Sequence, residues 1–182
     1  MKKFFAIFIL LISNFIIFQY SSAETTFNGF ILKPHANLKN INLAGINLLD
    51  DKLRGINLAG SDLSHSHLVS IDFSRSNLSN VDFSNSYLEN INFIGANLKG
   101  TNFNSSVINN SNLSFANLSH SSFVNTDVGK SNFYRSNLRG ANLEEAIFSE
   151  AVLTDALSGG IKGTPSTLNP SWYLKDGIII KK

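Results

Sequence analysis

The chain contains no cysteine, and this absence removes several chemistries at once. It has no disulfide, so an oxidising compartment would give it no covalent stabilisation. It has no thiol beside a signal-peptide cleavage site, so lipid attachment of that kind is excluded. A cysteine nucleophile is excluded for the same reason.

Runs of like charge and long apolar runs are also missing. The 15 Lys and Arg residues and the 13 Asp and Glu residues are scattered, so no linear basic run indicates a surface for nucleic acid or for an anionic membrane. The one extended apolar stretch, residues 4–18, is shorter than the roughly 20 residues that cross a bilayer. The sequence therefore predicts no stable membrane span.

The N-terminus has the three parts of an export signal. Lys2 and Lys3 precede the apolar stretch, and Ser21-Ser22-Ala23 gives a small-x-small cleavage site. We therefore expect residues 1–23 to be a signal peptide and the mature chain to begin at Glu24. This predicts a periplasmic or secreted protein, whose mature part has 13 basic and 13 acidic residues and a net charge near zero.

An apolar residue recurs at every fifth position through most of the chain, without a register slip. A period of five matches neither the 3.6 residues of a helical turn nor the alternation of a strand, so only a solenoid can bury all of these side chains. The 24 positions are Leu38, Leu43, Leu48, Leu53, Leu58, Leu63, Leu68, Phe73, Leu78, Phe83, Leu88, Phe93, Leu98, Phe103, Ile108, Leu113, Leu118, Phe123, Val128, Phe133, Leu138, Leu143, Phe148 and Leu153.

Units such as Ala96-Asn97-Leu98-Lys99-Gly100 and Ala141-Asn142-Leu143-Glu144-Glu145 resemble the A-(D/N)-L-x-x repeats of pentapeptide-repeat proteins. The resemblance covers residues 36–155. It implies an all-β fold, a right-handed quadrilateral β-helix of about six coils, with four pentapeptides to each coil. It also implies that the central residue and the residue two before it point inward.

Grouping the sequence by twenty places identical residues in register. One outward column is Asn37, Asn57, Asn77, Asn97, Asn117 and Asn137, a ladder whose side-chain amides can hydrogen-bond from rung to rung. The inner position two before each central residue is mostly Ser, Ala or Ile, and buried serine hydroxyls can bond to nearby carbonyls. Asp51 departs from that pattern. It indicates a local bulge or an outward-turned carboxylate, with a site carboxylate as the alternative.

Both ends of such a solenoid need covering, because an open end exposes strand edges and core. We expect residues 24–35 to form an N-terminal cap and residues 156–182 a C-terminal cap. Within the second cap, Asp176-Gly177 between two apolar runs predicts a β-hairpin over residues 172–180.

Catalytic chemistry is not indicated by any motif. His65 and His67 have a metal-ligand spacing, but they fall on a corner and on the next face, and no further ligand stands out. The glycines lie mostly at unit ends and lack the lysine and the helix of a phosphate loop. We therefore predict no catalytic residue, no metal, no cofactor and no enzymatic activity.

The outer positions offer two candidate interaction surfaces. The first lies on the third face and is the least polar exterior, and ordinary scattered surface apolar residues are its alternative explanation. The second, on the fourth face, mixes arginine with aromatic residues as protein interfaces do. The first comprises Leu49, His67, Val69, Tyr87, Val107 and Ile147; the second comprises Arg54, Arg75, Phe115, Tyr134 and Arg135.

These patterns predict a non-enzymatic exported scaffold that presents a rigid surface to an unidentified protein partner or to a second copy of itself. A surface that binds glycans or other ligands is the alternative. Some of the pentapeptide-repeat proteins that the sequence resembles mimic DNA and act on DNA gyrase, which is a further alternative. That function needs a strongly acidic surface and a cytosolic location, so it is the weakest of the three alternatives, and we expect no nucleic acid among the partners.

Overall fold

The computed structural model describes residues 11–12, 15–16 and 25–182. In these residues it contains strands and turns but no helix, and hence no helix able to cross a membrane. Strands β1 (Leu11–Ile12) and β2 (Phe15–Ile16) pair antiparallel. The expected cleavage site after Ala23 and the expected mature start at Glu24 lie outside the described residues.

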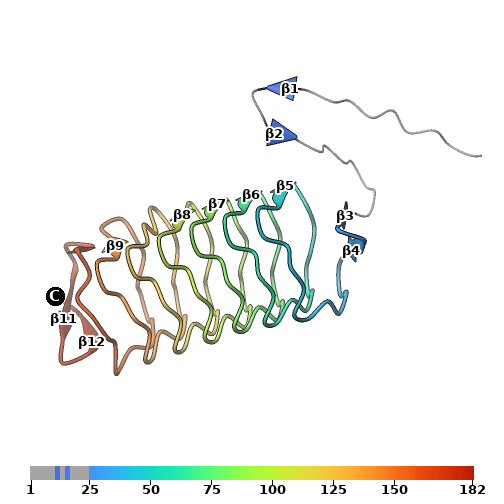
Figure 1. Ribbon diagram of the computed structural model, residues 1–182. Coiled ribbons are helices and arrows are strands. Elements are labelled where there is room, and N and C mark those ends of the chain that lie inside the picture. The colour runs from blue at the N-terminus through green and yellow to red at the C-terminus, as the bar shows by residue number, and fades with distance from the viewer. Residues whose placement is uncertain (1–10, 13–14, 17–24) are drawn as a thin grey trace, which may run out of the picture.

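From residue 36 onward the chain winds into coils that stack in a row (Figure 1). Each coil pairs with the next through parallel bridges between residues 20 apart, so one coil contains 20 residues. The bridges form four columns, which define four sides. The first side begins at Asn37, the second at Asn42, the third at Asn47 and the fourth at Lys52. The all-β solenoid predicted from the sequence is thus confirmed.

The third side carries the longest strands of the coils. Each of four successive coils contributes three residues there, and these form one parallel sheet with its residues in exact twenty-residue register. A further parallel pair lies nearer the C-terminus on the same side. The strands are β5 (Asn47–Leu49), β6 (His67–Val69), β7 (Tyr87–Glu89), β8 (Val107–Asn109), β9 (Ile147–Phe148) and β10 (Thr167–Leu168).

The core contains the every-fifth residues that the sequence predicts, together with apolar residues two positions before them, such as Ile56 and Ala96. Of the 24 central residues, 23 are buried, and Leu38 in the first coil is partly buried. The phenylalanines stack along the axis: the ring of Phe103 lies 5.5 Å from that of Phe83 and 5.1 Å from that of Phe123. Burial of each such side chain is worth about 1.5–3 kcal/mol, and stacking places these rings at favourable aromatic distances.

The repeat contains many small and polar residues because the chain turns a corner after each unit and because inner hydroxyl groups bond to backbone carbonyls. At Leu58, for example, the carbonyl accepts a hydrogen bond from the Ser61 amide across a turn whose third residue, Gly60, has a φ of 71°. Glycine and asparagine adopt such positive φ values at the least cost. Inner hydroxyls bond to carbonyls of the preceding coil, as Thr101 does to Leu78 at 2.8 Å.

The predicted asparagine ladder is present. The side-chain amide of Asn57 donates to Asn37 at 2.8 Å, and that of Asn97 donates to Asn77 at 3.1 Å. Asn117 and Asn137 continue the series with bonds of 3.4 and 3.3 Å. Four of the five steps of this column are therefore bridged by side-chain amides, and the step from Asn57 to Asn77 is joined by a backbone bridge alone.

A hairpin made of β3 (Thr25–Phe27) and β4 (Phe30–Leu32) precedes the first coil. Leu32 is buried in the core and Phe27 packs against it. The hairpin also reaches Asp51, because the Thr25 hydroxyl lies 2.9 and 2.8 Å from its two carboxylate oxygens. Burial raises the pKa of Asp51 above its ordinary 3.8, while the Thr25 hydrogen bond opposes that rise and the nearby Asp50 adds to it. Asp51 is thus a half-buried contact between the hairpin and the solenoid.

At the other end, the coil pairing continues beyond the last consensus unit. The sequence places the end of the repeat at Asp155, whereas Leu157 still bridges Asn137 and Lys162 bridges Asn142. Backbone pairing needs no particular side chain, which is why it outlasts the consensus. The chain then forms the hairpin of β11 (Trp172–Lys175) and β12 (Ile178–Lys181). Trp172 packs against the core, and the Gly177 carbonyl accepts a bond of 3.1 Å from the Ile161 amide.

Candidate interaction surfaces

Within residues 25–182, no group of three or more His, Asp or Glu side chains is arranged to hold a metal ion. His65 is exposed at a corner, with a φ of 58°. His67 instead stacks on Tyr87 in the next coil, with ring centroids 4.9 Å apart. The two histidines therefore take part in different contacts.

The six residues of the first candidate surface, hereafter the third-side surface, lie on the outer face of the β5–β8 sheet and its continuation. Register aligns them: His67 pairs with Tyr87, and Tyr87 pairs with Val107. Asp127 and Ile147 extend this column through further bridges. Val107 and Ile147 are each 38% exposed, while Leu49, Val69 and Tyr87 are half-buried. The surface runs along the solenoid axis, and the charged Asp127 separates Ile147 from the other members.

A hydrogen bond fixes the aromatic centre of the third-side surface. The Tyr87 hydroxyl donates to Glu89 Oε2 at 2.9 Å, and this bond to the carboxylate raises the pKa of the Tyr87 phenol. With His67 stacked on one side and Val107 following in the column, the Tyr87 ring is held along the face of the sheet. This surface is therefore preorganised.

The second candidate surface follows the corner between the fourth and first sides. We call it the corner ridge. It consists of the predicted residues Arg54, Arg75, Phe115, Tyr134 and Arg135, together with Ile94, which lies between Arg75 and Phe115. Backbone bonds link neighbouring coils there, from the Arg75 amide to the Ile94 carbonyl and from the Phe115 amide to the Tyr134 carbonyl, each 2.9 Å. Phe115 is 54% exposed, more than any other large hydrophobic side chain among the described residues.

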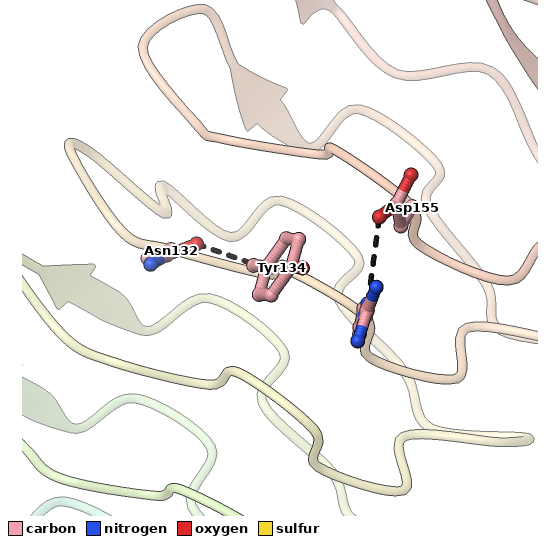
Figure 2. A network of polar contacts seen from close by, with 4 residues as sticks. Asn132, Tyr134 and Asp155 are labelled. Atoms are coloured by element: carbon pink, nitrogen blue, oxygen red, sulfur yellow. Dashed lines mark hydrogen bonds and ion pairs between the residues drawn. The ribbon is translucent and has the colours of Figure 1, made fainter.

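Contacts at one end of the corner ridge are shown in Figure 2. The Tyr134 amide donates to Asn132 Oδ1 at 2.9 Å, and Arg135 Nε lies 3.4 Å from Asp155 Oδ2 in the next coil. The Arg135 guanidinium lies 5.0 Å from the centre of the Tyr134 ring, and the Phe115 ring meets Tyr134 edge-on at 5.5 Å. The structure thus brings Phe115, Tyr134 and Arg135 into one chain of contacts.

Backbone conformation distinguishes the corner ridge from other corners. Arg75, Phe115 and Arg135 all have positive φ, at 57°, 60° and 53°. Asparagine, aspartate, histidine, serine or glycine fills nearly all the other positive-φ positions among the described residues. A long or bulky side chain in this conformation costs about 1–2 kcal/mol, and such departures concentrate at functional sites.

Sequence reasoning missed two exposed apolar residues beside the corner ridge. Val152 is 44% exposed on the fourth side and Leu157 is 46% exposed on the first. Val152 immediately precedes the central residue Leu153, and the position before a central residue faces outward. Listing these outward positions of the fourth side would therefore have identified Val152 as an exposed apolar residue. Leu157 lies beyond the last consensus unit and carried no such signal.

Comparison with known families identifies the repeat. Residues 76–153 match the family model described as "Pentapeptide repeat region", and residues 52–90 match the model described as "Pentapeptide repeats (8 copies)". Together the two matches run from residue 52 to residue 153, which is more than half of the chain. No curated protein matches the chain.

Several solved structures are similar. A pentapeptide repeat protein from the Arabidopsis thaliana thylakoid lumen is 26% identical over 51% of this chain and 68% of its own, with a TM-score of 0.43. QnrB1, a plasmid-mediated fluoroquinolone resistance protein, is 17% identical over 66% of each chain, with a TM-score of 0.42. HetL, involved in heterocyst differentiation regulation in the cyanobacterium Nostoc, is 23% identical over 65% of each, with a TM-score of 0.33. This chain spans about two thirds of each of these proteins.

Proposed function

Because the chain belongs to the pentapeptide-repeat family, we propose that it is an exported, non-enzymatic scaffold whose third-side surface binds a protein partner. The observation that carries the proposal is that each strand of the β5–β8 sheet places an apolar or aromatic side chain on its outer face, namely Leu49, His67 with Val69, Tyr87 and Val107. Apolar and aromatic side chains stand there in register over successive coils, on a rigid parallel sheet. Aromatic and aliphatic residues of this kind form the centres of protein interfaces.

Export is supported by the first 23 residues, which combine Lys2 and Lys3, an apolar stretch and a small-x-small site. The expected mature product begins at Glu24. Intact mass of the protein recovered outside the cytoplasm tests this expectation, because a product that retains residues 1–23 would contradict it.

The third-side surface can be tested by one substitution. Val107→Lys places an ammonium group beside the Asp127 carboxylate, its neighbour in the column, so the folded chain tolerates it. In an interface the same group would be desolvated and should weaken association by roughly 2 kcal/mol or more. The monomer–dimer equilibrium is measured by sedimentation, and other partners are measured by quantitative pull-down from envelope extract.

Ser119→Glu is the matched control, since it also adds a charge to an outward position but on the first side. The proposal expects Val107→Lys to lose association and Ser119→Glu to retain it. If Val107→Lys associates like the unmodified protein while Ser119→Glu does not, the binding surface is on the first side instead.

A further inference from the structure

Folding separates the charges of this chain onto different sides. Seven of the eight cationic residues in the repeat, residues 36–155, lie on the fourth and first sides. Eight of the eleven acidic residues lie on the second and third sides. The seven are Lys39, Lys52, Arg54, Arg75, Lys99, Arg135 and Arg139; the eight are Asp50, Asp62, Asp82, Glu89, Asp127, Glu144, Glu145 and Glu150. A chain of almost balanced charge thus has a cationic half and an anionic half.

The three carboxylates on the cationic half are each engaged. Asp51 accepts from the Thr25 hydroxyl at the hairpin. Asp72 accepts from the Asn92 side chain at 3.0 Å and from the Ser74 amide at 2.9 Å. Asp155 pairs with Arg135. With seven cationic residues against these three carboxylates, the cationic half keeps a net positive charge, and the first side has no acidic residue in the repeat.

Apolar side chains stand outward in the middle of this cationic half. Ile94 and Phe115 are 37% and 54% exposed, and Tyr134 lies against Phe115. Arg54 and Arg75 precede them along the corner ridge, and Arg135 follows them. The corner ridge thus has an apolar centre with arginines at both ends.

The backbone conformation at Phe115 speaks against a role in folding. The residue is exposed and has a positive φ, which asparagine adopts at six other corners: Asn40, Asn80, Asn85, Asn90, Asn110 and Asn125. A phenylalanine at such a position gains little from the core and is unfavourable for the backbone. Its exposure therefore points to a ligand that accepts an apolar group.

We propose that the corner ridge docks onto the surface of a lipid bilayer with anionic phosphate headgroups. In this arrangement Phe115 and Ile94 enter the boundary between headgroups and acyl chains, and the surrounding lysines and arginines contact the phosphates. Surface-bound proteins combine a buried apolar face with basic residues in this manner. A soluble polyanion would interact with the cations but would give no advantage to an exposed phenylalanine.

This surface is separate from the third-side surface, and neither proposal rests on the other. In the repeat, the third side carries Asp50, Glu89, Asp127 and Glu150 against a single cation, Lys130, so its net charge is negative and anionic lipid repels it. A membrane docked on the corner ridge leaves the third side free to hold a protein.

The test is binding of the exported protein to vesicles, measured by co-sedimentation. Vesicles of phosphatidylcholine with phosphatidylglycerol should bind it, vesicles of phosphatidylcholine alone should not, and added salt should weaken binding. Phe115→Asn should weaken binding about tenfold, and Arg75→Gln about fivefold. All variants are prepared with the same N-terminus, which is checked by intact mass. Any contribution of the N-terminal residues to vesicle binding is therefore the same in every variant.

Val107→Asn is the matched control, because it exchanges an exposed apolar residue for asparagine on the third side. It should bind vesicles like the unmodified protein. Equal vesicle binding by Phe115→Asn, or no preference for phosphatidylglycerol, overturns the proposal. So does tight binding of a soluble acidic polysaccharide that Phe115→Asn leaves unchanged, since that result identifies a polyanion site. Thermal unfolding of Phe115→Asn within a few degrees of the unmodified protein shows that the loss is not caused by unfolding.

Discussion

Replacing Phe103 with alanine should destabilise the solenoid far more than any surface change of similar size. Phe103 is fully buried, and its ring stacks between Phe83 and Phe123 and meets Phe93 edge-on at 6.4 Å. Truncating a buried phenylalanine to alanine costs about 3–5 kcal/mol in all, and the loss of three aromatic contacts places Phe103 at the upper end of that range. We therefore expect a loss of about 5 kcal/mol, which is a large part of the stability of an ordinary domain.

Urea unfolding followed by circular dichroism measures this loss. With a denaturant slope of about 2 kcal/mol per molar, the midpoint should fall by about 2.5 M. Phe115→Asn is the comparison, since it removes an exposed phenylalanine and its edge-on contact with Tyr134 but relieves a positive-φ position. Its midpoint should move by about 0.5 M or less. Equal midpoint shifts for the two variants would refute the inward and outward assignments.

Three further substitutions probe buried and half-buried polar groups. Burial raises the pKa of Asp51, so the folded state holds the proton more tightly than the unfolded state, and stability falls as pH rises from 3.8 toward the raised value. Asp51→Asn lacks this loss, so its stability relative to the unmodified protein should grow across that window in urea titrations at about pH 3, 5 and 7; a constant difference would contradict the argument. Ser136 Oγ is, among the described residues, a buried oxygen without a hydrogen-bond partner, so Ser136→Ala should leave the melting temperature unchanged or raise it by a few degrees. Thr126→Val should lower it by a similar amount, because Thr126 donates a 2.6 Å bond to the Phe103 carbonyl, and the same sign for both variants would refute this account.

Much of the fold could be predicted because its determinants repeat. A buried position every five residues allows only a solenoid, and the twenty-residue register of Asn37 and its equivalents indicates which side chains bond across coils. Members of both candidate surfaces were also identified from their columns, as Val107 and Phe115 illustrate. In each case the necessary information is local, since every unit repeats the same pattern.

Features without a repeat could not be predicted in this way. Thr25 lies outside the repeat and meets Asp51 only because the first hairpin folds over the first coil. Leu157 and Lys162 continue the coil pairing although their units have lost the consensus, because the pairing is made by backbone groups. The contact between Phe115 and Tyr134 likewise joins residues of different coils.

The sequence by itself determined the class of fold, the inward residues and the absence of any motif for catalysis. Only the tertiary structure decided how the outer residues act together. Arg75 and Arg135 are distant in the chain and belong to no charged run, yet winding by twenty residues places them on one corner with Phe115 between them. The burial of each residue follows from its own position in the repeat and can be predicted from the sequence pattern. An interaction surface combines residues that are distant in the sequence, and these come together only when the coils stack.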